Sequence, residues 1–246
     1  MKRACQALAE GKGSIKDVQR ELAKVGCAEC ERGQTLRKRM KSLEIVKGQR
    51  TASWKQKRRG LVTASQVASI LKQNPYETPR ALLMKKLDIV VFKGNKFTKH
   101  GVVMESAALE RYAVETGHEV DEYGLLMDPE NDWLAGSPDG ITPCGRLIEV
   151  KCPVTREIVL GEVPRHYMAQ IQTLLHITKL DVCDFVEMKG PNEFQIVEVK
   201  RDLDWFATHE SELRKFHTKL HEAIENPELA PRPRKRKAKV HAFDFG

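Results

Sequence analysis

Two short segments, SPDG at residues 137–140 and EVK at residues 149–151, constrain the fold of this chain more than any other feature. The turn-forming residues 142–145 lie between them, which predicts two strands joined by a tight connection. Pairing these strands would place Asp139 beside Glu149. Because side chains alternate along a strand, Glu149 and Lys151 would point to the same face. The sequence therefore predicts two carboxylates and one ammonium group converging at one point on a sheet.

Such a group of charges suits a divalent metal ion. Adjacent carboxylates raise each other's pKa unless a cation lies between them, and Lys151 supplies only one positive charge. Oxygen ligands favour Mg²⁺ or Mn²⁺, and such an ion can activate water and stabilise charge on a phosphodiester. Two other Glu-x-Lys tripeptides, at 187–189 and 198–200, follow no Pro-Asp at hairpin distance. We expect those two to mark the polar faces of strands.

A third acidic residue emerges from helical periodicity. Residues 98–116 are predicted to form a helix that begins at Thr98 and stops at Gly117. Glu105 lies on the same face of this helix as Leu109 and Tyr112. A carboxylate on a buried stripe is costly unless it is paired or bound to a metal. The pattern leaves two alternatives for Glu105, a metal ligand or a buried ion pair with Arg or Lys.

The order of the predicted elements defines the fold class. Helix starts are predicted after Thr63 and at the Thr78-Pro79 step, followed by the long helix and a run of strands. The order favours one α/β domain with a mixed central β-sheet flanked by helices. The strands are predicted at 119–127, 132–137, 146–151, 182–189 and 194–200, and two later helices at 164–177 and 203–224.

Charge is distributed unevenly along the 246 residues. Residues 1–60 hold 17 Lys and Arg against 6 Asp and Glu, whereas residues 61–230 hold 19 against 27. Basic ends around an acidic middle suit a protein that binds a polyanion and divalent cations, and ordinary solvated charge is the alternative. The densest basic run contains Arg234, Lys235, Arg236 and Lys237.

That run is typical of a nuclear-import signal or a nucleic-acid-binding tail, so we expect a nuclear location, and otherwise a cytoplasmic one. The first residues lack the apolar core of a secretion signal, and no apolar run is long enough to span a membrane. The six cysteines are therefore expected to be reduced thiols. Cys27 and Cys30 form a Cys-x-x-Cys, but no second pair of zinc ligands follows at matching spacing, which favours plain thiols at a helix end over a metal site.

Six sequence blocks together resemble a known family. The chain resembles the phage lambda exonuclease family, the YqaJ-type viral alkaline exonucleases of the PD-(D/E)xK nuclease superfamily, over roughly residues 54–225. The blocks appear in the family's order: Trp54-(x3)-Arg58, 63–65 (TAS), Gly101-(x3)-Glu105, 137–140 (SPDG), 149–153 (EVKCP) and 167–172 (YMAQIQ). The resemblance implies a PD-(D/E)xK restriction-endonuclease-like core at residues 54–228. It leaves residues 1–53 as a basic helical extension and 229–246 as a basic tail.

The resemblance also implies roles for individual residues. Lys151 would orient the nucleophilic water and Gln170 would support the same site, while Tyr167, one turn away, is interpreted as core packing. The metal ligands would be Glu105, Asp139, Glu149 and the carbonyl of Val150. The 5′-phosphate of a DNA end would be held by Arg58, Ser65 and Ser137.

The implied activity is Mg²⁺- or Mn²⁺-dependent 5′→3′ hydrolysis of one strand of duplex DNA to 5′-mononucleotides. The family implies a role in recombination or repair beside a single-strand annealing protein, and a homo-trimer. An iron–sulfur cluster is not expected, because Cys144, Cys152 and Cys183 do not form the required set. Two alternatives are an endonuclease of the same superfamily and a non-catalytic DNA-end-binding module. The latter would have lost an acid or the lysine, and this chain retains all of them.

Overall fold

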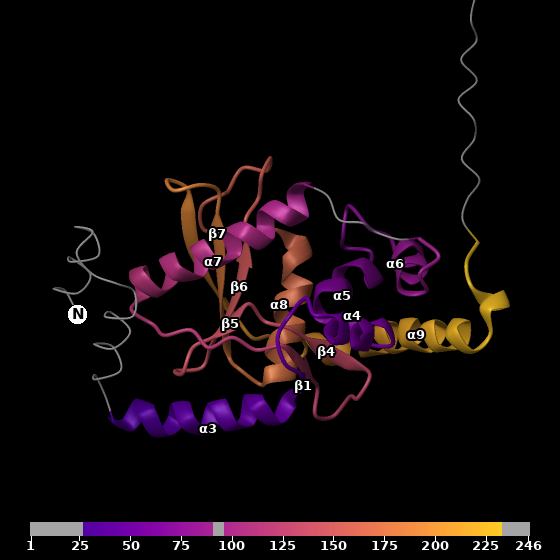
Figure 1. Ribbon diagram of the computed structural model, residues 1–246, viewed down its shortest axis with the longest axis horizontal. Coiled ribbons are helices and arrows are strands. Elements are labelled where there is room, and N and C mark those ends of the chain that lie inside the picture. Colours follow the sequence, from indigo (N-terminus) through magenta and orange to yellow (C-terminus); the bar gives the residue numbers. More distant parts are fainter. Residues whose placement is uncertain (1–26, 91–95, 233–246) are drawn as a thin grey trace, which may run out of the picture.

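The computed structural model describes residues 27–90 and 96–232 (Figure 1). The basic run at 234–237 and residues 1–26 of the N-terminal extension lie outside the described residues. The helices are α3 (Cys27–Leu43), α4 (Ala52–Arg59), α5 (Ala64–Ile70), α6 (Pro79–Lys86), α7 (Lys96–Thr116), α8 (Arg165–Thr178) and α9 (Trp205–Glu225), followed by the 3₁₀ turn η1 (Pro227–Leu229).

Within the described residues, eight strands form two sheets of four strands each. The first sheet has the order β1-β3-β4-β2, and the second has the order β5-β6-β7-β8. In the second sheet β6 and β7 run parallel, and the other pairs are antiparallel. The strands are β1 (Glu44–Val46), β2 (Val62–Thr63), β3 (Leu125–Met127), β4 (Leu134–Gly136), β5 (Gly140–Ile141), β6 (Arg146–Lys151), β7 (Val182–Met188) and β8 (Phe194–Lys200).

The α/β class with a mixed β-sheet flanked by helices is confirmed, and the structure adds a second four-stranded sheet that the sequence did not predict. The chain leaves the first sheet after Gly136 and enters the second at Gly140. Pro138, which lies in this break, has no N–H to donate to a ladder. The break interrupts the strand pairing just where the acidic motif lies.

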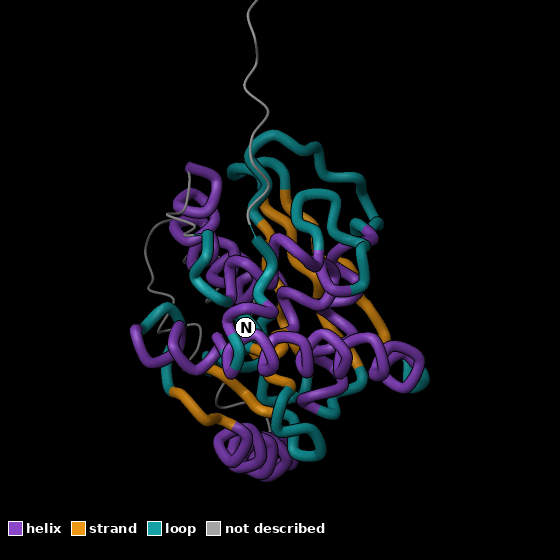
Figure 2. The backbone as a smooth tube through the Cα atoms, turned by 90° about the vertical axis from the view of Figure 1, so that its right-hand side faces the viewer, coloured by secondary structure: helices purple, strands orange, loops and turns teal. Residues whose placement is uncertain are grey.

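Helices cover both faces of the second sheet (Figures 1 and 2). On β6, Ile148 and Val150 point to one side and pack with Tyr112 of α7. Leu147 points to the other side and packs with the residues of α8. Since alternate residues share a face, Glu149 and Lys151 point toward the α8 side. The strand therefore carries its apolar and its charged residues on opposite faces near its end.

Close packing brings α8 onto the first sheet. A Cβ added at Gly136 of β4 would lie 2.5 Å from Leu174 Cδ2, so any larger residue would force Leu174 to move. Leu174 and Ile171, which are fully buried, anchor the same helix in the main core. The helix predicted from Pro164 to 177 is thus confirmed, and its position fixes Gln170 relative to β6.

Local capping agrees with the prediction at Thr78 and differs at Thr63, and Thr51 caps a further helix for which the sequence analysis predicted no start. Thr78 accepts a hydrogen bond from the Ala81 N–H at the start of α6, with Pro79 in the first turn. Thr51 caps α4 in the same way through the Trp54 N–H. Thr63 precedes α5 as expected, but its side chain makes no capping bond and is buried between a strand and a helix.

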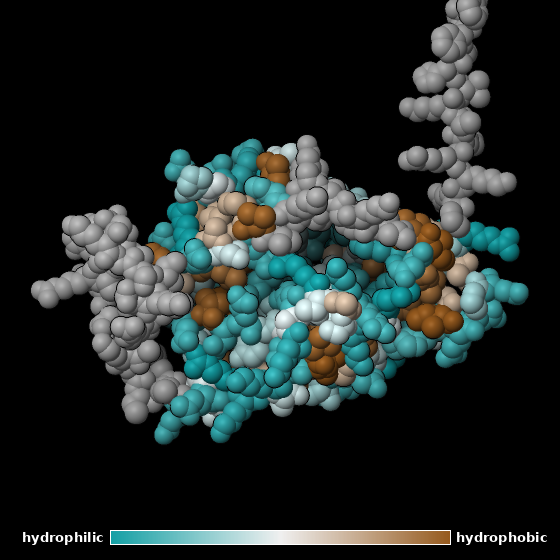
Figure 3. Space-filling model, in the orientation of Figure 1, coloured by the Kyte–Doolittle hydropathy of each residue, from teal (hydrophilic) through white to brown (hydrophobic). Residues whose placement is uncertain are grey.

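The face seen in Figure 3 is largely hydrophilic, with small apolar groups. Ile89 and Val90, which follow α6, are among the exposed apolar residues. Among the described residues, no helix has both the length and the apolar character needed to cross a lipid bilayer.

Candidate active site

The β5–β6 hairpin brings Asp139 and Glu149 together, as the spacing predicts. The Thr142 N–H donates to the Arg146 carbonyl at 2.9 Å and closes the turn. Gly140 faces Ile148 across the ladder, and the Asp139 N–H donates to the Ile148 carbonyl at 3.2 Å. The Val150 N–H in turn donates to Asp139 Oδ2 at 2.7 Å. Backbone hydrogen bonds therefore fix the Asp139 carboxylate against β6.

Glu149 lies at the centre of the site. Its side chain is 1% exposed, and its Oε1 accepts hydrogen bonds from Lys151 Nζ and, at 2.5 Å, from Gln170 Nε2. Its Oε2 is buried and has no hydrogen-bond partner within the described part of the chain. A buried acceptor without a partner is costly, so this oxygen is the atom of the site best suited to bind a cation.

The electrostatics of the site also favour a bound cation. Burial, followed by repulsion from Glu149, raises the pKa of Asp139 to about 7. Burial likewise raises the pKa of Glu149, although Lys151 and Gln170 oppose the rise. Burial alone would lower the pKa of Lys151, but Glu149 and Asp139 together raise it above its ordinary value. One ammonium thus faces two carboxylates that hold protons tightly.

Glu105 of α7 completes the acidic group and has a partner that the sequence analysis missed. Arg50 Nη2 lies 2.5 Å from Glu105 Oε2, while the Glu105 side chain remains 22% exposed. Burial and the charge of Asp139 raise the pKa of Glu105, whereas Arg50 lowers it. The ion-pair alternative for Glu105 is therefore present, and its carboxylate is close enough to Asp139 to influence it. No motif marked Arg50, which adopts a positive φ of 64° in the loop before α4.

The three residues assigned to a 5′-phosphate also lie together. Arg58 Nη2 donates to Ser65 Oγ at 3.0 Å, and the guanidinium lies 4.0 Å from the ring centroid of Trp54. Trp54 Nε1 donates to Ser137 Oγ at 2.9 Å. Because Ser137 is two residues before Asp139, these contacts connect α4 directly to the acidic motif. Burial lowers the pKa of Arg58 to about 10, which leaves the guanidinium charged at neutral pH.

Lys86, which no motif predicted, is hydrogen-bonded to the backbone of Arg58. Its Nζ donates to the Arg58 carbonyl at 2.8 Å and to the Leu61 carbonyl at 2.6 Å, and the residue is 5% exposed. Burial, followed by the charge of Arg58, lowers the pKa of Lys86 to about 7. Lys86 therefore donates hydrogen bonds to two carbonyls at the end of α4, although its amine is only partly protonated at neutral pH.

One expectation about the other Glu-x-Lys motifs is wrong. Glu187 was expected on a polar strand face, but its side chain is fully buried and forms an ion pair with Arg156. Gln195 Nε2 also donates to Glu187 Oε2 at 2.8 Å. The reason is that the loop after β6 folds back over β7 and brings Arg156 to this carboxylate. The ion pair between Arg156 and Glu187 therefore holds the loop after Lys151 against β7.

Tyr167 contacts both the core and the site. Its ring lies 5.6 Å from that of Phe185, consistent with the core-packing interpretation. It also lies 5.1 Å from Lys151 Nζ and 4.0 Å from the His166 ring. His166 meets Tyr76 edge-on at 6.1 Å, and Tyr76 is 84% exposed. A row of three rings thus leads from the surface to Lys151.

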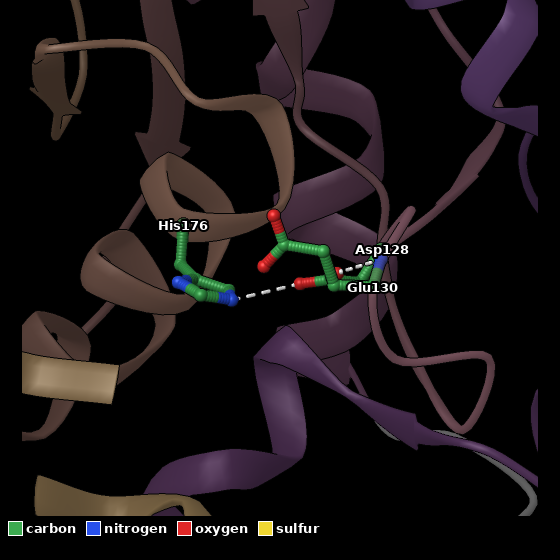
Figure 4. Close-up of side chains that lie close together, drawn as sticks. All are labelled: Asp128, Glu130 and His176. Carbon is green, nitrogen blue, oxygen red and sulfur yellow. Dashed lines mark hydrogen bonds and ion pairs between the residues drawn. The ribbon is translucent and has the colours of Figure 1, made fainter. Parts of the chain in front are cut away.

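A second group of ligand-type side chains, Asp128, Glu130 and His176, shares no residue with this site (Figure 4). Asp128 Oδ1 accepts the N–H groups of Glu130 and Asn131, and its Oδ2 lies 2.9 Å from His176 Nε2. Glu130 is exposed and pairs with Lys179. Asp128 thus pairs with His176 and Glu130 with Lys179, so we interpret the group as the structural link between the β3–β4 loop and α8.

Solved structures of exonucleases are similar to this chain in fold. The alkaline exonuclease LHK-Exo from Laribacter hongkongensis is 31% identical, with a TM-score of 0.62 over 72% of this chain and 96% of that chain. The same protein in complex with dAMP gives a TM-score of 0.63. A phage-related exonuclease from Haemophilus somnus is 18% identical with a TM-score of 0.50, which shows a shared fold alone.

A viral protein is also similar in sequence. The uncharacterized protein R354 of Acanthamoeba polyphaga mimivirus is 33% identical over 159 residues, which are 57% of this chain. The match spans only 29% of the length of that relative.

The fold and the arrangement of the acidic residues define a nuclease core of the PD-(D/E)xK class. Residues 53–181, more than half of the chain, match the YqaJ-like viral recombinase domain. The chain belongs to the YqaJ-like viral recombinase domain family.

Proposed function

We propose that this protein is a Mg²⁺-dependent 5′→3′ exodeoxyribonuclease that digests one strand of duplex DNA from its end and releases 5′-mononucleotides. The observation that carries the proposal is the buried Oε2 of Glu149, which lies near Asp139 and has no hydrogen-bond partner among the described residues. LHK-Exo, a 31% identical alkaline exonuclease, has been solved in complex with dAMP, which is a 5′-mononucleotide. The product class that we propose follows from that likeness.

The residues present fit a hard divalent cation. The carboxylates of Glu105, Asp139 and Glu149 would hold it together with the Val150 carbonyl, an all-oxygen set that suits Mg²⁺ or Mn²⁺. When bound, the cation supplies a lowered pKa for water and neutralises charge on the phosphodiester. Asp139 must lose its proton before a cation can bind. Its pKa of about 7 leaves it partly protonated at neutral pH without a cation.

The remaining site residues would position the reactants. Lys151 stays an ammonium because both carboxylates raise its pKa, so it can hold a water or a phosphate oxygen as a hydrogen-bond donor. Gln170 holds Glu149 Oε1 and fixes the orientation of that carboxylate. Tyr167 covers Lys151 and reduces its access to bulk solvent.

The polarity of digestion would come from Arg58. A guanidinium binds a terminal phosphate bidentately, and Ser65 already lies within hydrogen-bonding distance of it. Ser137 lies next to Trp54 and two residues before Asp139, so a phosphate held by this cluster sits beside the acidic group. A 5′-phosphorylated end held there would present its first phosphodiester to the carboxylates.

The test uses linear and covalently closed duplex DNA, labelled at the 5′ or the 3′ end, with Mg²⁺ or with EDTA. We expect early release of the 5′ label as a mononucleotide, late release of the 3′ label, no cutting of closed circles and no reaction with EDTA. Cutting of closed circles would identify an endonuclease instead. Binding without any cleavage would identify a non-catalytic end-binding module.

A further inference from the structure

The loop between α5 and α6 presents an aromatic ring to solvent, although hydrogen bonds hold its backbone in place. Tyr76 is 84% exposed, and its backbone N–H donates to Asn74 Oδ1 at 2.9 Å. Asn74 Nδ2 in turn donates to Ser69 Oγ at 2.9 Å. Ser69, which is fully buried, donates to Glu77 Oε2 at 2.9 Å. The loop is therefore fixed on both sides of the exposed ring.

Two rings of α8 continue from Tyr76 to Lys151. Tyr76 meets His166 edge-on at 6.1 Å, and the His166 and Tyr167 rings lie 4.0 Å apart. Tyr167 in turn lies 5.1 Å from Lys151 Nζ. Burial, followed by the charges of Arg156 and Lys151, lowers the pKa of His166, so this ring is neutral at neutral pH. The outer part of the row is thus an uncharged aromatic surface, which suits the stacking of a nucleobase better than the binding of a phosphate.

The two ends of this row adjoin the two places where a terminal nucleotide would be held. Tyr76 follows α5, which carries Ser65, the partner of Arg58 in the proposed site for the terminal phosphate. At the other end, Lys151 contacts Glu149, where the first phosphodiester would be cut. Helices α5 and α8 pack against each other, so the two parts of the row have a fixed relative position (Figure 1). A nucleotide that spans the two phosphate positions would therefore lie alongside the rings.

We propose that Tyr76 and His166 stack on the base of the terminal nucleotide of the digested strand, an inference that rests on the proposed exonuclease function. A base that turns onto these rings must leave its pairing partner, and stacking offsets part of that cost. Because every base has an aromatic face, the contact favours no particular base sequence. Tyr76 and His166 are thus substrate-binding residues that hold the nucleotide while its phosphodiester is cut.

The test compares two duplexes that carry a 5′-phosphate and differ only in the 5′-terminal nucleotide. One has a mismatched base there and the other has a tetrahydrofuran abasic analogue, so neither needs to be unpaired. With Mg²⁺, we expect the wild type to release the base-bearing nucleotide about 10-fold faster, because only this nucleotide can stack. Tyr76→Ala should reduce that ratio by at least about 3-fold, and Tyr76→Phe, which keeps the ring, should preserve it.

Leu203→Ala is the matched control for removal of an exposed side chain. Leu203 is 74% exposed and follows β8 at the end of the second sheet opposite Lys151, so this variant should keep the wild-type ratio. If Tyr76 served only to stabilise the fold, Tyr76→Ala would slow both duplexes equally, and that result would overturn the proposal. Equal rates of the wild type on the two duplexes would overturn it as well.

A binding measurement separates this proposal from the nuclease assignment. Asp139→Asn should bind the base-bearing duplex about 10-fold more tightly than the abasic duplex, and the further change Tyr76→Ala should reduce that preference. If the affinity difference is present but the wild type cuts neither duplex, the exonuclease function alone is rejected. If the wild type digests both duplexes from the 5′ end at one rate, and Asp139→Asn binds them equally, the stacking contact alone is rejected.

Discussion

The backbone N–H of Val150 donates to Asp139 Oδ2 at 2.7 Å, so the residue between Glu149 and Lys151 holds the other carboxylate of the site. Asparagine can accept the same hydrogen bond without carrying the charge. We therefore expect Asp139→Asn to fold normally and to lose nuclease activity with Mg²⁺ by at least about 100-fold, because a charged cation ligand is lost. Near wild-type activity of this variant would contradict the assignment of Asp139.

Without a bound metal, the stability of the wild type should decrease between pH 3.8 and about 7. The pKa of Asp139 rises from 3.8 to about 7 on folding, so the folded state binds the proton more tightly than the unfolded state does. Without Mg²⁺, stability is therefore lost as the pH increases from 3.8 through about 7. Thermal unfolding in EDTA should show this loss, Mg²⁺ should reverse it, and Asp139→Asn should show a smaller loss, because burial also raises the pKa of Glu149. If the unfolding temperatures of the wild type and this variant differed by the same amount at every pH, proton binding by Asp139 would not be the cause.

The apparent affinity for Mg²⁺ should increase with pH. A cation can bind Asp139 only after its proton leaves, and the pKa of about 7 places that competition near neutrality. Cleavage at subsaturating Mg²⁺ should rise as the pH passes through this value and then level off. Calorimetry in buffers of different ionisation enthalpy should detect proton release on Mg²⁺ binding below it. Equal Mg²⁺ affinity on both sides of pH about 7 would exclude the competition.

Arg58 should distinguish 5′-phosphorylated from 5′-hydroxyl ends. Lysine keeps the charge but cannot form the bidentate contact, so Arg58→Lys should slow digestion of phosphorylated ends by about 10-fold or more and affect hydroxyl ends less. Arg59→Lys is the matched control, because Arg59 is exposed and pairs only with Asp88 among the described residues. Equal losses on both kinds of end would refute the phosphate contact.

The three Glu-x-Lys motifs should respond differently to the same change. Glu149→Gln should abolish activity, since its carboxylate is the central candidate ligand. Glu187→Gln should destabilise the protein by about 3 kcal/mol, because it leaves the part-buried Arg156 without its anionic partner. Glu198→Gln, at a half-exposed carboxylate, should change stability by less than about 1 kcal/mol. Urea unfolding curves compare the three, and similar stabilities for Glu187→Gln and Glu198→Gln would contradict the role of burial.

Lys86 should make the stability of the protein depend on pH between about 7 and 10.5. Its pKa falls from 10.5 to about 7 on folding, so between these values the unfolded state binds more protons and stability increases with pH. Lys86→Met should remove that increase and should also weaken the end of α4, whose carbonyls lose their donor. The measurement is the free energy of unfolding across this range, in the presence of Mg²⁺. A wild-type curve that falls there would argue against a neutral Lys86.

The local features of the site were predictable from the sequence because they depend on short-range rules. Strand alternation placed Glu149 and Lys151 on one face, and the turn at 142–145 placed Asp139 opposite them. Helical periodicity located Glu105 on the inner face of α7. Within these segments, pattern and structure agree because the same backbone geometry determines both.

The residues that the sequence analysis missed depend on contacts between distant segments. Arg50 reaches Glu105 across 55 residues, and Arg156 reaches Glu187 only because the loop after β6 folds back. Lys86 is buried beneath α4, although its own helix has no apolar pattern that would predict it. The division into two sheets also escaped prediction, since strand order depends on the whole chain.

The hydrogen bond between Trp54 Nε1 and Ser137 Oγ has a consequence for the length of the product. It ties the helix that carries Arg58 to the strand break that leads into Asp139, so neither can shift without the other. In the proposed enzyme, the distance between the residues that bind the terminal phosphate and the residues that cut the chain would therefore be constant. That distance, rather than the base sequence of the DNA, would determine how many nucleotides are released at each step.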